Sequence, residues 1–480
     1  MTHRDAATAI EREEAAVEAR SAALAKELGL VDLTLTQVLF IVGLPWVGVA
    51  AKLGPSHVIF WLIAMVFFYV PSAVVVIHLN GAMPLEGGLY QWAKLGFNEP
   101  IGFLDAWNLW LFAILNTSET GLQVTQYLVY IIGPGGAWLT DSKWFITLVS
   151  AVLIAALVVI TVVGFGVGKW VHKAGGVLML GTFATLMLLP WVNVAHGSLP
   201  EYHPLTTAVP VVSVMSLNLL GKMGFGALGG FEYVAIHAGE CRNPVRSIGR
   251  SVAVAAPIIA AMFILGTSAM SALVPLDRID LIAPIPQALS AGFRPLGWAA
   301  AVAPVAIGAL LSIRVAQASV MFAGNTRLPM VAGWDGLLPD WFTRFHSRYH
   351  TPVNSIVFVG AATFALSIAG LIGVGKQEAF QLLWNASAIF YALTYLVMFA
   401  IPLIGRSGRH APPLWVRASA LSGFAMTLLF VVLSILPIVQ VQSRVLFALK
   451  ISSLIVLTNI IGAAIFLGRR HLRRQVSVLG

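Results

Sequence analysis

Four ionisable side chains lie inside long apolar stretches of this 480-residue chain, where a charge is costly. They are Glu119, Lys222, Glu232 and Arg314, and Asp105 lies nearer the end of such a stretch. Charged groups in an apolar interior pair with one another, bind polar solutes or exchange protons. We therefore take these residues as the first candidates for solute binding and proton movement.

A polar stripe follows one helical face of segment 101–131, and we expect it to line a cavity. We assign Asn116 and Glu119 to substrate binding. The alternative is a helix–helix interface with internal hydrogen bonds. The stripe consists of Asp105, Asn108, Phe112, Asn116, Glu119, Thr120, Gln123, Tyr127 and Tyr130.

The remaining charges each have a functional and a structural interpretation. Lys222 either pairs with Glu119, which is the simpler case, or meets an anionic group of the substrate. Glu232 either exchanges protons or makes a permanent hydrogen bond. Arg314 is a second coupling candidate, or a structural partner of Glu232 or of backbone carbonyls.

The composition determines which elements must carry these residues. The chain is 58% hydrophobic and 10% charged, whereas a soluble domain usually carries about 25% charged residues. Its apolar blocks are long enough to cross a bilayer as helices. We predict an all-α protein that contacts the lipid bilayer through twelve spans: 33–53, 57–79, 101–131, 144–164, 174–195, 209–238, 250–275, 296–323, 353–374, 379–404, 416–438 and 447–468.

The formal net charge of +9 indicates topology rather than nucleic-acid binding. The basic residues sit mainly in short loops between apolar blocks, without the aromatic-interleaved face of a nucleic-acid site. With a cytoplasmic N-terminus, Lys and Arg concentrate in cytoplasmic loops. We expect both tails, 1–31 and 469–480, to be cytoplasmic, in the cell membrane. The first tail has no apolar core and is not a signal peptide.

Two spans are interrupted in matching places, the first and the sixth. Proline removes a backbone donor and glycine lowers the cost of unwinding. Paired interruptions point to a solute site between inverted repeats, and the alternative is close helix packing. Trp46 would stack on the solute or gate it, or merely pack. The candidate residues are Gly43, Leu44, Pro45, Trp46 and Gly48 in the first span, and Phe225, Gly226, Ala227 and Leu228 in the sixth.

Three short segments resemble the amino acid–polyamine–organocation transporter family. The first pairs the loop Pro84-Leu85-Glu86-Gly87-Gly88-Leu89-Tyr90 with the helix start Gly102-Phe103-Leu104-Asp105-Ala106-Trp107. The others are Gly230-Phe231-Glu232, followed by Glu240 and Asn243-Pro244, and the segment Asp335-Gly336-Leu337-Leu338-Pro339. The bulky Leu44-Pro45-Trp46 departs from the small residues that the family often has at its first break.

The resemblance implies a LeuT-type fold. Its five-helix repeats would cover 32–200 and 201–404, and two further helices would lie in 405–468. It also implies secondary active transport of amino acids or related solutes by alternating access, with proton coupling or exchange. Sodium-coupled relatives form an ion site on the eighth helix, so a guanidinium at Arg314 argues against sodium.

Other functions fit the residues less well. Single charges of both signs make no catalytic cluster, so we expect no enzyme, and the histidines show no ligand spacing for a metal. We expect no cofactor. A channel and a solute sensor on a transporter scaffold are the remaining alternatives. The small-molecule substrate is first a zwitterionic amino acid and second an amine or polyamine, bound through Glu119 and Asp105.

Overall fold

The computed structural model describes residues 28–479, except 86, 242, 335, 370, 372–375, 406–410, 439–440 and 442. The described part consists of helices and loops without strands, so the all-α class is confirmed. Most of the predicted N-terminal tail, residues 1–27, lies outside the described residues. So do the motif residues Glu86 and Asp335.

The first half of the chain forms a series of helices of very different lengths. In order they are α2 (Leu30–Ile41), α3 (Leu44–Ala51), η1 (Gly54–Ser56), α4 (His57–Ala64), η2 (Met65–Tyr69), α5 (Val70–Ala82), α6 (Leu89–Gly96), α7 (Glu99–Ser118), α8 (Thr120–Ile132), η3 (Pro134–Thr140), α9 (Lys143–Val163) and α10 (Phe165–His196).

The second half begins after an irregular loop and is also a series of helices of very different lengths. Its elements are α11 (Val214–Gly221), η4 (Lys222–Ala227), η5 (Phe231–Glu240), α12 (Pro244–Leu273), η6 (Leu276–Arg278), α13 (Pro284–Phe293), η7 (Arg294–Ala301), α14 (Val302–Trp334), η8 (Asp340–Thr343), α15 (Val353–Ala369), α16 (Lys376–Ile404), α17 (Leu414–Ser434) and α18 (Arg444–Leu479).

By length and composition, eight helices in the described ranges can cross a membrane, or nine if the bent pair α2–α3 counts as one span. Large apolar side chains cover their outer surfaces, as on α9, where Leu148, Val152 and Val159 are each at least 60% exposed. Contiguous apolar surface of this kind suits hydrocarbon rather than water.

The other predicted spans fall on shorter or interrupted helices. Segment 101–131 comprises α7 and α8, separated by a turn at Glu119. Segment 209–238 comprises α11, the π-helix η4 and the 3-10 helix η5, and 353–374 holds the 17-residue α15. The predicted end of the eighth span at 323 is wrong, because α14 continues to Trp334. There the buried Arg327 donates to the carbonyl of Ala323, so this charge does not end the helix.

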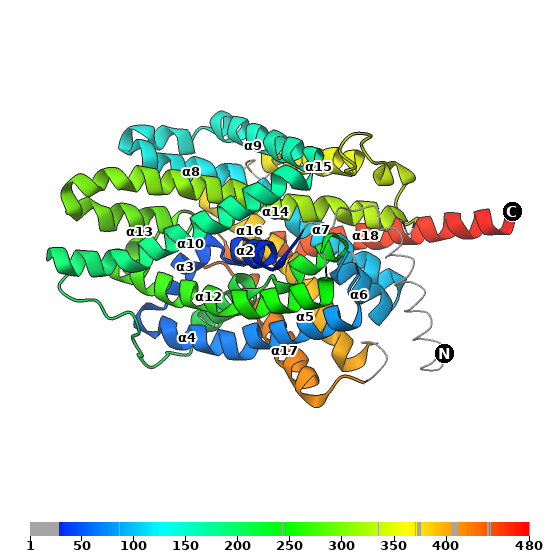
Figure 1. Ribbon diagram of the computed structural model, residues 1–480, viewed down its shortest axis with the longest axis horizontal. Coiled ribbons are helices and arrows are strands. Elements are labelled where there is room, and N and C mark those ends of the chain that lie inside the picture. The colour runs from blue at the N-terminus through cyan, green and yellow to red at the C-terminus, as the bar shows by residue number, and fades with distance from the viewer. Residues whose placement is uncertain are drawn as a thin grey trace.

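The broken helices lie in the middle of the bundle (Figure 1). Helix α2 packs against α10, α12 and α14, and α3 packs against α12, α13 and η4. On the other side, α16 packs against α7 and α17. Helix α18 projects beyond the bundle towards the C-terminus, on the right of Figure 1. The bundle therefore surrounds the two interrupted helices with continuous ones.

Candidate solute-binding site

The first broken helix changes direction at the predicted proline–glycine segment. Helices α2 and α3 are bent by 47° relative to each other. Gly43 has an extended backbone between them, and Pro45 lies in the first turn of α3. Pro45 has no N–H and the N–H of Trp46 donates to the carbonyl of Gly43, so the N-terminus of α3 presents the N–H of Leu44 and a partial positive charge.

The second break follows η4. The chain leaves the helix at Leu228 and turns at Gly230, whose φ of 135° favours glycine. A methyl group at Gly230 would also lie 2.7 Å from Cγ1 of Ile41, so the two breaks approach each other closely. The N–H of Gly230 donates to the hydroxyl of Tyr395 at 2.6 Å.

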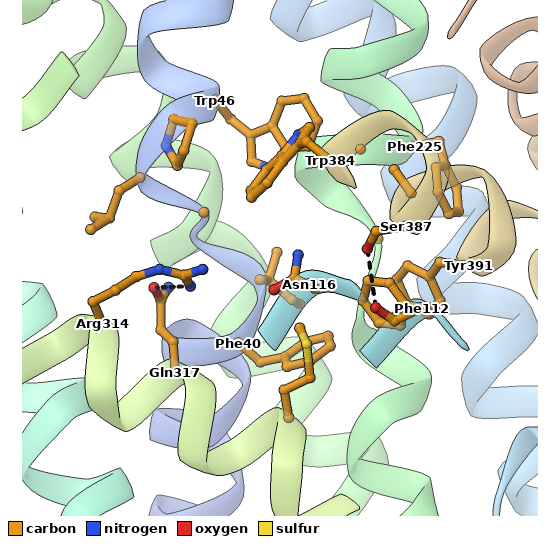
Figure 2. A pocket seen from close by; sticks show the side chains of 18 residues that line it. Phe40, Trp46, Phe112, Asn116, Phe225, Arg314, Gln317, Trp384, Ser387 and Tyr391 are labelled. Carbon is orange, nitrogen blue, oxygen red and sulfur yellow. Dashed lines mark hydrogen bonds between the residues drawn. The ribbon is translucent and has the colours of Figure 1, made fainter. Parts of the chain in front are cut away.

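Both breaks face one cavity of about 70 Å³, which is room for a few water molecules. Figure 2 shows its walls, which come from α2–α3, α7, η4, α14 and α16. Aromatic side chains dominate the lining, with few polar groups. The lining residues are Phe40, Ile41, Gly43, Leu44, Pro45, Trp46, Phe112, Asn116, Phe225, Gly226, Gly229, Arg314, Gln317, Met321, Trp384, Ser387, Ala388 and Tyr391.

Trp46 closes one side of this cavity. Its ring centroid lies 5.3 Å from that of Trp384, and Figure 2 shows the two indoles together at one end of the open space. A methyl group at Gly226 would lie 2.6 Å from Cη2 of Trp46, so the indole rests directly on the second break. Trp46 therefore connects the two broken helices through a single contact.

Arg314 pairs with Glu119. The distance from Nη2 to Oε1 is 2.7 Å, and the two side chains are 8% and 0% exposed. The predicted pairing of Lys222 with Glu119 is wrong, and so is a partnership of Arg314 with Glu232. Arg314 lines the cavity, whereas Glu119 lies behind it. A solute in the cavity therefore meets a guanidinium whose charge is already balanced.

Gln317 hydrogen-bonds to the backbone carbonyl groups at the first break. Its Nε2 donates to the carbonyls of Leu39 and Val42, both at 2.9 Å, and its Oε1 accepts from Arg314 at 3.3 Å. The sequence prediction missed this residue. Its position three residues after Arg314, on the same helical face, was the available signal.

Lys222 points away from the cavity. Its Nζ donates to Asn385 Oδ1 at 3.0 Å and to Ser434 Oγ at 3.5 Å, and it lies 5.7 Å from the ring centroid of Phe430. These partners are neutral side chains of α16 and α17. Lys222 is therefore buried between η4, α16 and α17 and is not one of the residues that line the cavity.

Glu232 lies one side chain away from the cavity. The hydroxyls of Tyr391 and Tyr395 both donate to its carboxylate, and Tyr391 lines the cavity. In the described residues these tyrosines are the side-chain hydrogen-bond partners of Glu232. The carboxylate is fully buried. Any change in its protonation reaches the cavity through the hydroxyl of Tyr391.

The polar stripe of segment 101–131 divides between two surroundings. Of its members, Phe112 and Asn116 line the cavity. Asn108 instead exchanges hydrogen bonds with Asn459 of α18, and Tyr130 donates to Asp280 at 2.8 Å. For Asn108 the alternative of a helix–helix interface holds, whereas Tyr130 bonds to the loop between η6 and α13.

Other candidate residues are buried without reaching the cavity. A methyl group at Gly48 would lie 2.6 Å from Cβ of Pro284, so this glycine permits close packing of α3 on α13. Ala227 and Leu228 are buried at the end of η4. The sequence prediction missed the contribution of α16, although polar and aromatic residues at spacings of three and four mark that face: Trp384, Ser387 and Tyr391.

The Amino acid permease family model matches residues 28–466. The chain belongs to this family. The match confirms the resemblance carried by the three motifs, and the family is one of permeases rather than enzymes. Together with its apolar helices, membership makes this permease an integral, multi-pass membrane protein.

Several curated proteins are similar to this permease at low identity. An uncharacterized transporter of Legionella pneumophila is 25% identical over 81% of this chain and 83% of its own length. Cationic amino acid transporter 7, chloroplastic, of Arabidopsis thaliana is 26% identical over 78% and 70%. A probable agmatine/putrescine antiporter of Lactococcus lactis is 20% identical over 73% of each chain. The relatives are thus transporters of small organic solutes.

Proposed function

We propose that this permease is a secondary active transporter of zwitterionic amino acids that works by alternating access. The convergence of both helix breaks on one enclosed cavity is the observation that carries the proposal. We further propose twelve spans with both termini cytoplasmic in the cell membrane. Repeats 32–200 and 201–404 would be inverted copies, followed by two helices in 405–468.

The two breaks provide opposite partial charges for a zwitterion. The N–H of Leu44 and the partial positive charge at the start of α3 favour a carboxylate, and the last carbonyl groups of η4 favour an ammonium. Both helix ends line the cavity, through Gly43 and Leu44 and through Gly226. Phe112, Phe225 and other aromatic rings would then contact an apolar side chain. Because Glu119 neutralises Arg314, a neutral amino acid fits this environment best.

An amine or polyamine is the second candidate. Among the described residues, Oε2 of Glu119 is buried without a hydrogen-bond partner, and a cationic solute would supply one. The agmatine/putrescine antiporter among the relatives agrees with this chemistry. Such a solute would have to replace Arg314 as the ion-pair partner of Glu119, so amine transport requires this ion pair to break.

We propose protons rather than sodium as the coupling ion. Glu232 would carry the proton by exchanging its two tyrosine partners for water that enters with the substrate. Arg314 would hold the side chain of Gln317 in place. Gln317 already donates hydrogen bonds to the carbonyl groups that a cation at the first break would need as ligands. Exchange of substrates would use the same cavity without net proton movement.

Flux into proteoliposomes tests transport itself. The purified permease is reconstituted, and uptake of labelled leucine, alanine, arginine and putrescine is measured against protein-free liposomes. We expect saturable uptake and trans-stimulation, with the neutral amino acids preferred. Binding without flux would indicate a sensor, and flux that does not saturate would indicate a channel; either result contradicts the proposal.

Substitution Glu232→Gln tests the coupling. We expect the variant to lose uptake driven by a pH gradient and to keep exchange of labelled for unlabelled substrate. Glu378→Gln is the matched control, because Glu378 pairs with Lys450 in a partly exposed ion pair away from the cavity. Unchanged proton-driven uptake in Glu232→Gln would remove Glu232 from the coupling role.

A further inference from the structure

Asp105 of α7 is a buried carboxyl group that has no hydrogen-bond partner in the part of the chain that the structure describes. The residue is 3% exposed. Both of its side-chain oxygens are buried, and neither has a partner among the described residues. A carboxylate in such surroundings must take up a proton or a cation to avoid a large desolvation cost. The fold therefore keeps a costly group that neither the ion pair nor the cavity uses.

Helical geometry places Asp105 on the face of α7 that meets α16. Phe112 lies seven residues later, which is two turns or about 10 Å along the helix. The ring of Phe112 stacks on Tyr391 at 4.1 Å between centroids. Asp105 is thus two turns from the cavity wall, towards the end of α7 that begins at Glu99. In the proposed topology that end is cytoplasmic.

The carboxylate of Glu232 is one tyrosine away from the cavity, and it is held by the helix α16 that packs against α7. Tyr391 connects Glu232 to the cavity, and Tyr395, one turn further along α16, holds its other oxygen. The charge of Glu232 acts electrostatically on Asp105. A sequence of groups therefore runs from the cavity through Tyr391 and Glu232 to Asp105.

The other charged groups near α7 are engaged elsewhere. Arg314 is bound by Glu119, and Lys450 of α18 by Glu378 of α16. On α6, Lys94 lies 6.0 Å from the ring centroid of Tyr90, and on α14, Arg327 donates to a backbone carbonyl. The described titratable side chains on the elements packed against α7 are Tyr90, Lys94, Glu119, Tyr127, Tyr130, Arg314, Arg327, Glu378, Tyr391, Tyr395, Arg444, Lys450 and Arg469, besides Glu99 on α7 itself.

We propose that Asp105 is a second proton carrier, which receives the proton of Glu232 and releases it to water on the cytoplasmic side. In this step the O–H bond of the Glu232 carboxyl breaks and an O–H bond forms on the Asp105 carboxylate. The two groups share one negative charge before and after. The inference rests on the proposed role of Glu232, and it adds the residue that takes the proton out of the dry interior.

Proteoliposomes that contain a trapped pH-sensitive dye test this inference. Transport of unlabelled leucine, or of the best substrate found above, should acidify vesicles with the wild-type permease. In Asp105→Asn we expect acidification to fall to the level of protein-free vesicles while the protein still exchanges labelled substrate. Asp105→Glu, which keeps a carboxyl group, should restore acidification. Asp277→Asn, the same change at an exposed residue, should match the wild type.

The outcomes separate this inference from the proposed function. Normal acidification by Asp105→Asn, together with loss in Glu232→Gln, overturns the role of Asp105 and leaves the coupling intact. Acidification that persists in Glu232→Gln overturns the coupling itself. Uptake that needs sodium and loses this need in Asp105→Asn would make the carboxylate a sodium ligand, against the proposal. A lowered melting temperature with lost exchange would make Asp105 structural, because removal of an unpaired buried charge should not destabilise.

Discussion

Arg314 on α14 and Glu119 at the end of α7 form an ion pair 2.7 Å long in the interior of the bundle. Removal of one partner leaves the other charge buried and unpaired, which costs about 3–5 kcal/mol. We therefore expect Glu119→Gln to lower the melting temperature in detergent and to abolish uptake. The double variant Glu119→Gln/Arg314→Gln should recover much of the stability, because no unpaired charge remains.

The ion pair of Glu378 with Lys450 provides the control for this double-mutant cycle. It lies at a partly exposed position, where a pair contributes about 0–1 kcal/mol. Glu378→Gln should barely change the melting temperature. Strictly additive losses in the double variant at 119 and 314 would show that these two residues do not act as a pair.

The second prediction is that sodium does not bind at the first break. Because Gln317 already donates to the carbonyls of Leu39 and Val42, uptake should be the same in sodium and in choline buffers. Gln317→Ala should lower stability, since a buried acceptor left without its donor costs about 1–3 kcal/mol. Gln126→Ala, at a half-buried glutamine that donates to Asp280 at 3.4 Å, should cost less, because that hydrogen bond is long. A steep rise of uptake with sodium in the wild type would contradict this assignment.

A third prediction follows from the contact of Trp46 with Gly226. In Gly226→Ala, the added methyl group would lie 2.6 Å from the indole, so the two broken helices could not close together. We expect uptake to fall at least tenfold, which corresponds to about 1.4 kcal/mol, with little loss of expression. Trp46→Phe in the same chain should restore part of the uptake, because the smaller ring leaves room.

Two controls test the contact of Trp46 with Gly226: a glycine-to-alanine change elsewhere, and the Trp46→Phe variant alone. Gly181→Ala on α10 has free space around the added methyl group and should behave like the wild type. Trp46→Phe alone should change the preference among substrates more than the maximal rate. If Gly226→Ala transported normally, the contact would not limit closure.

Local chemistry made the breaks predictable from the sequence. Proline at position 45 and glycine at 226 act through their own backbone geometry, so their effects do not depend on distant partners. The same residues then lie at the cavity, together with Trp46, Asn116 and Phe225. The resemblance of short motifs to a known family was equally local, and the family match confirmed it.

The pairing of buried charges was not predictable in the same way. The sequence offers two buried cations that could pair with Glu119, Lys222 and Arg314, and the choice depends on how α7, η4 and α14 are rotated relative to one another. Lys222 was assigned to Glu119, but η4 turns it towards Asn385 of α16. The contribution of α16 to the cavity was not predicted, because this helix has no proline or glycine at the cavity. It nevertheless supplies Trp384 and Tyr391 to the lining.

Lys222 provides the fourth prediction. A buried ammonium with neutral partners contributes little net stability, because its hydrogen bonds offset only part of its desolvation. We expect Lys222→Met, of similar length, to keep the melting temperature within a few degrees and to leave the KM for substrate unchanged. Lys222→Glu should unfold the protein or prevent its insertion, because a carboxylate among Asn385, Ser434 and Phe430 would face the ring of Phe430.

Measuring both KM and the melting temperature of Lys222→Met separates a structural role of Lys222 from a role in substrate binding. Lys222 does not line the cavity, so a change among its partners Asn385 and Ser434 should reach the substrate only through a shift of the helices that carry them. Phe225→Ala, which removes a lining ring from the same π-helix, should raise KM instead. If Lys222→Met raised KM as Phe225→Ala does while the melting temperature held, the ammonium would contact the substrate in another state of the transport cycle.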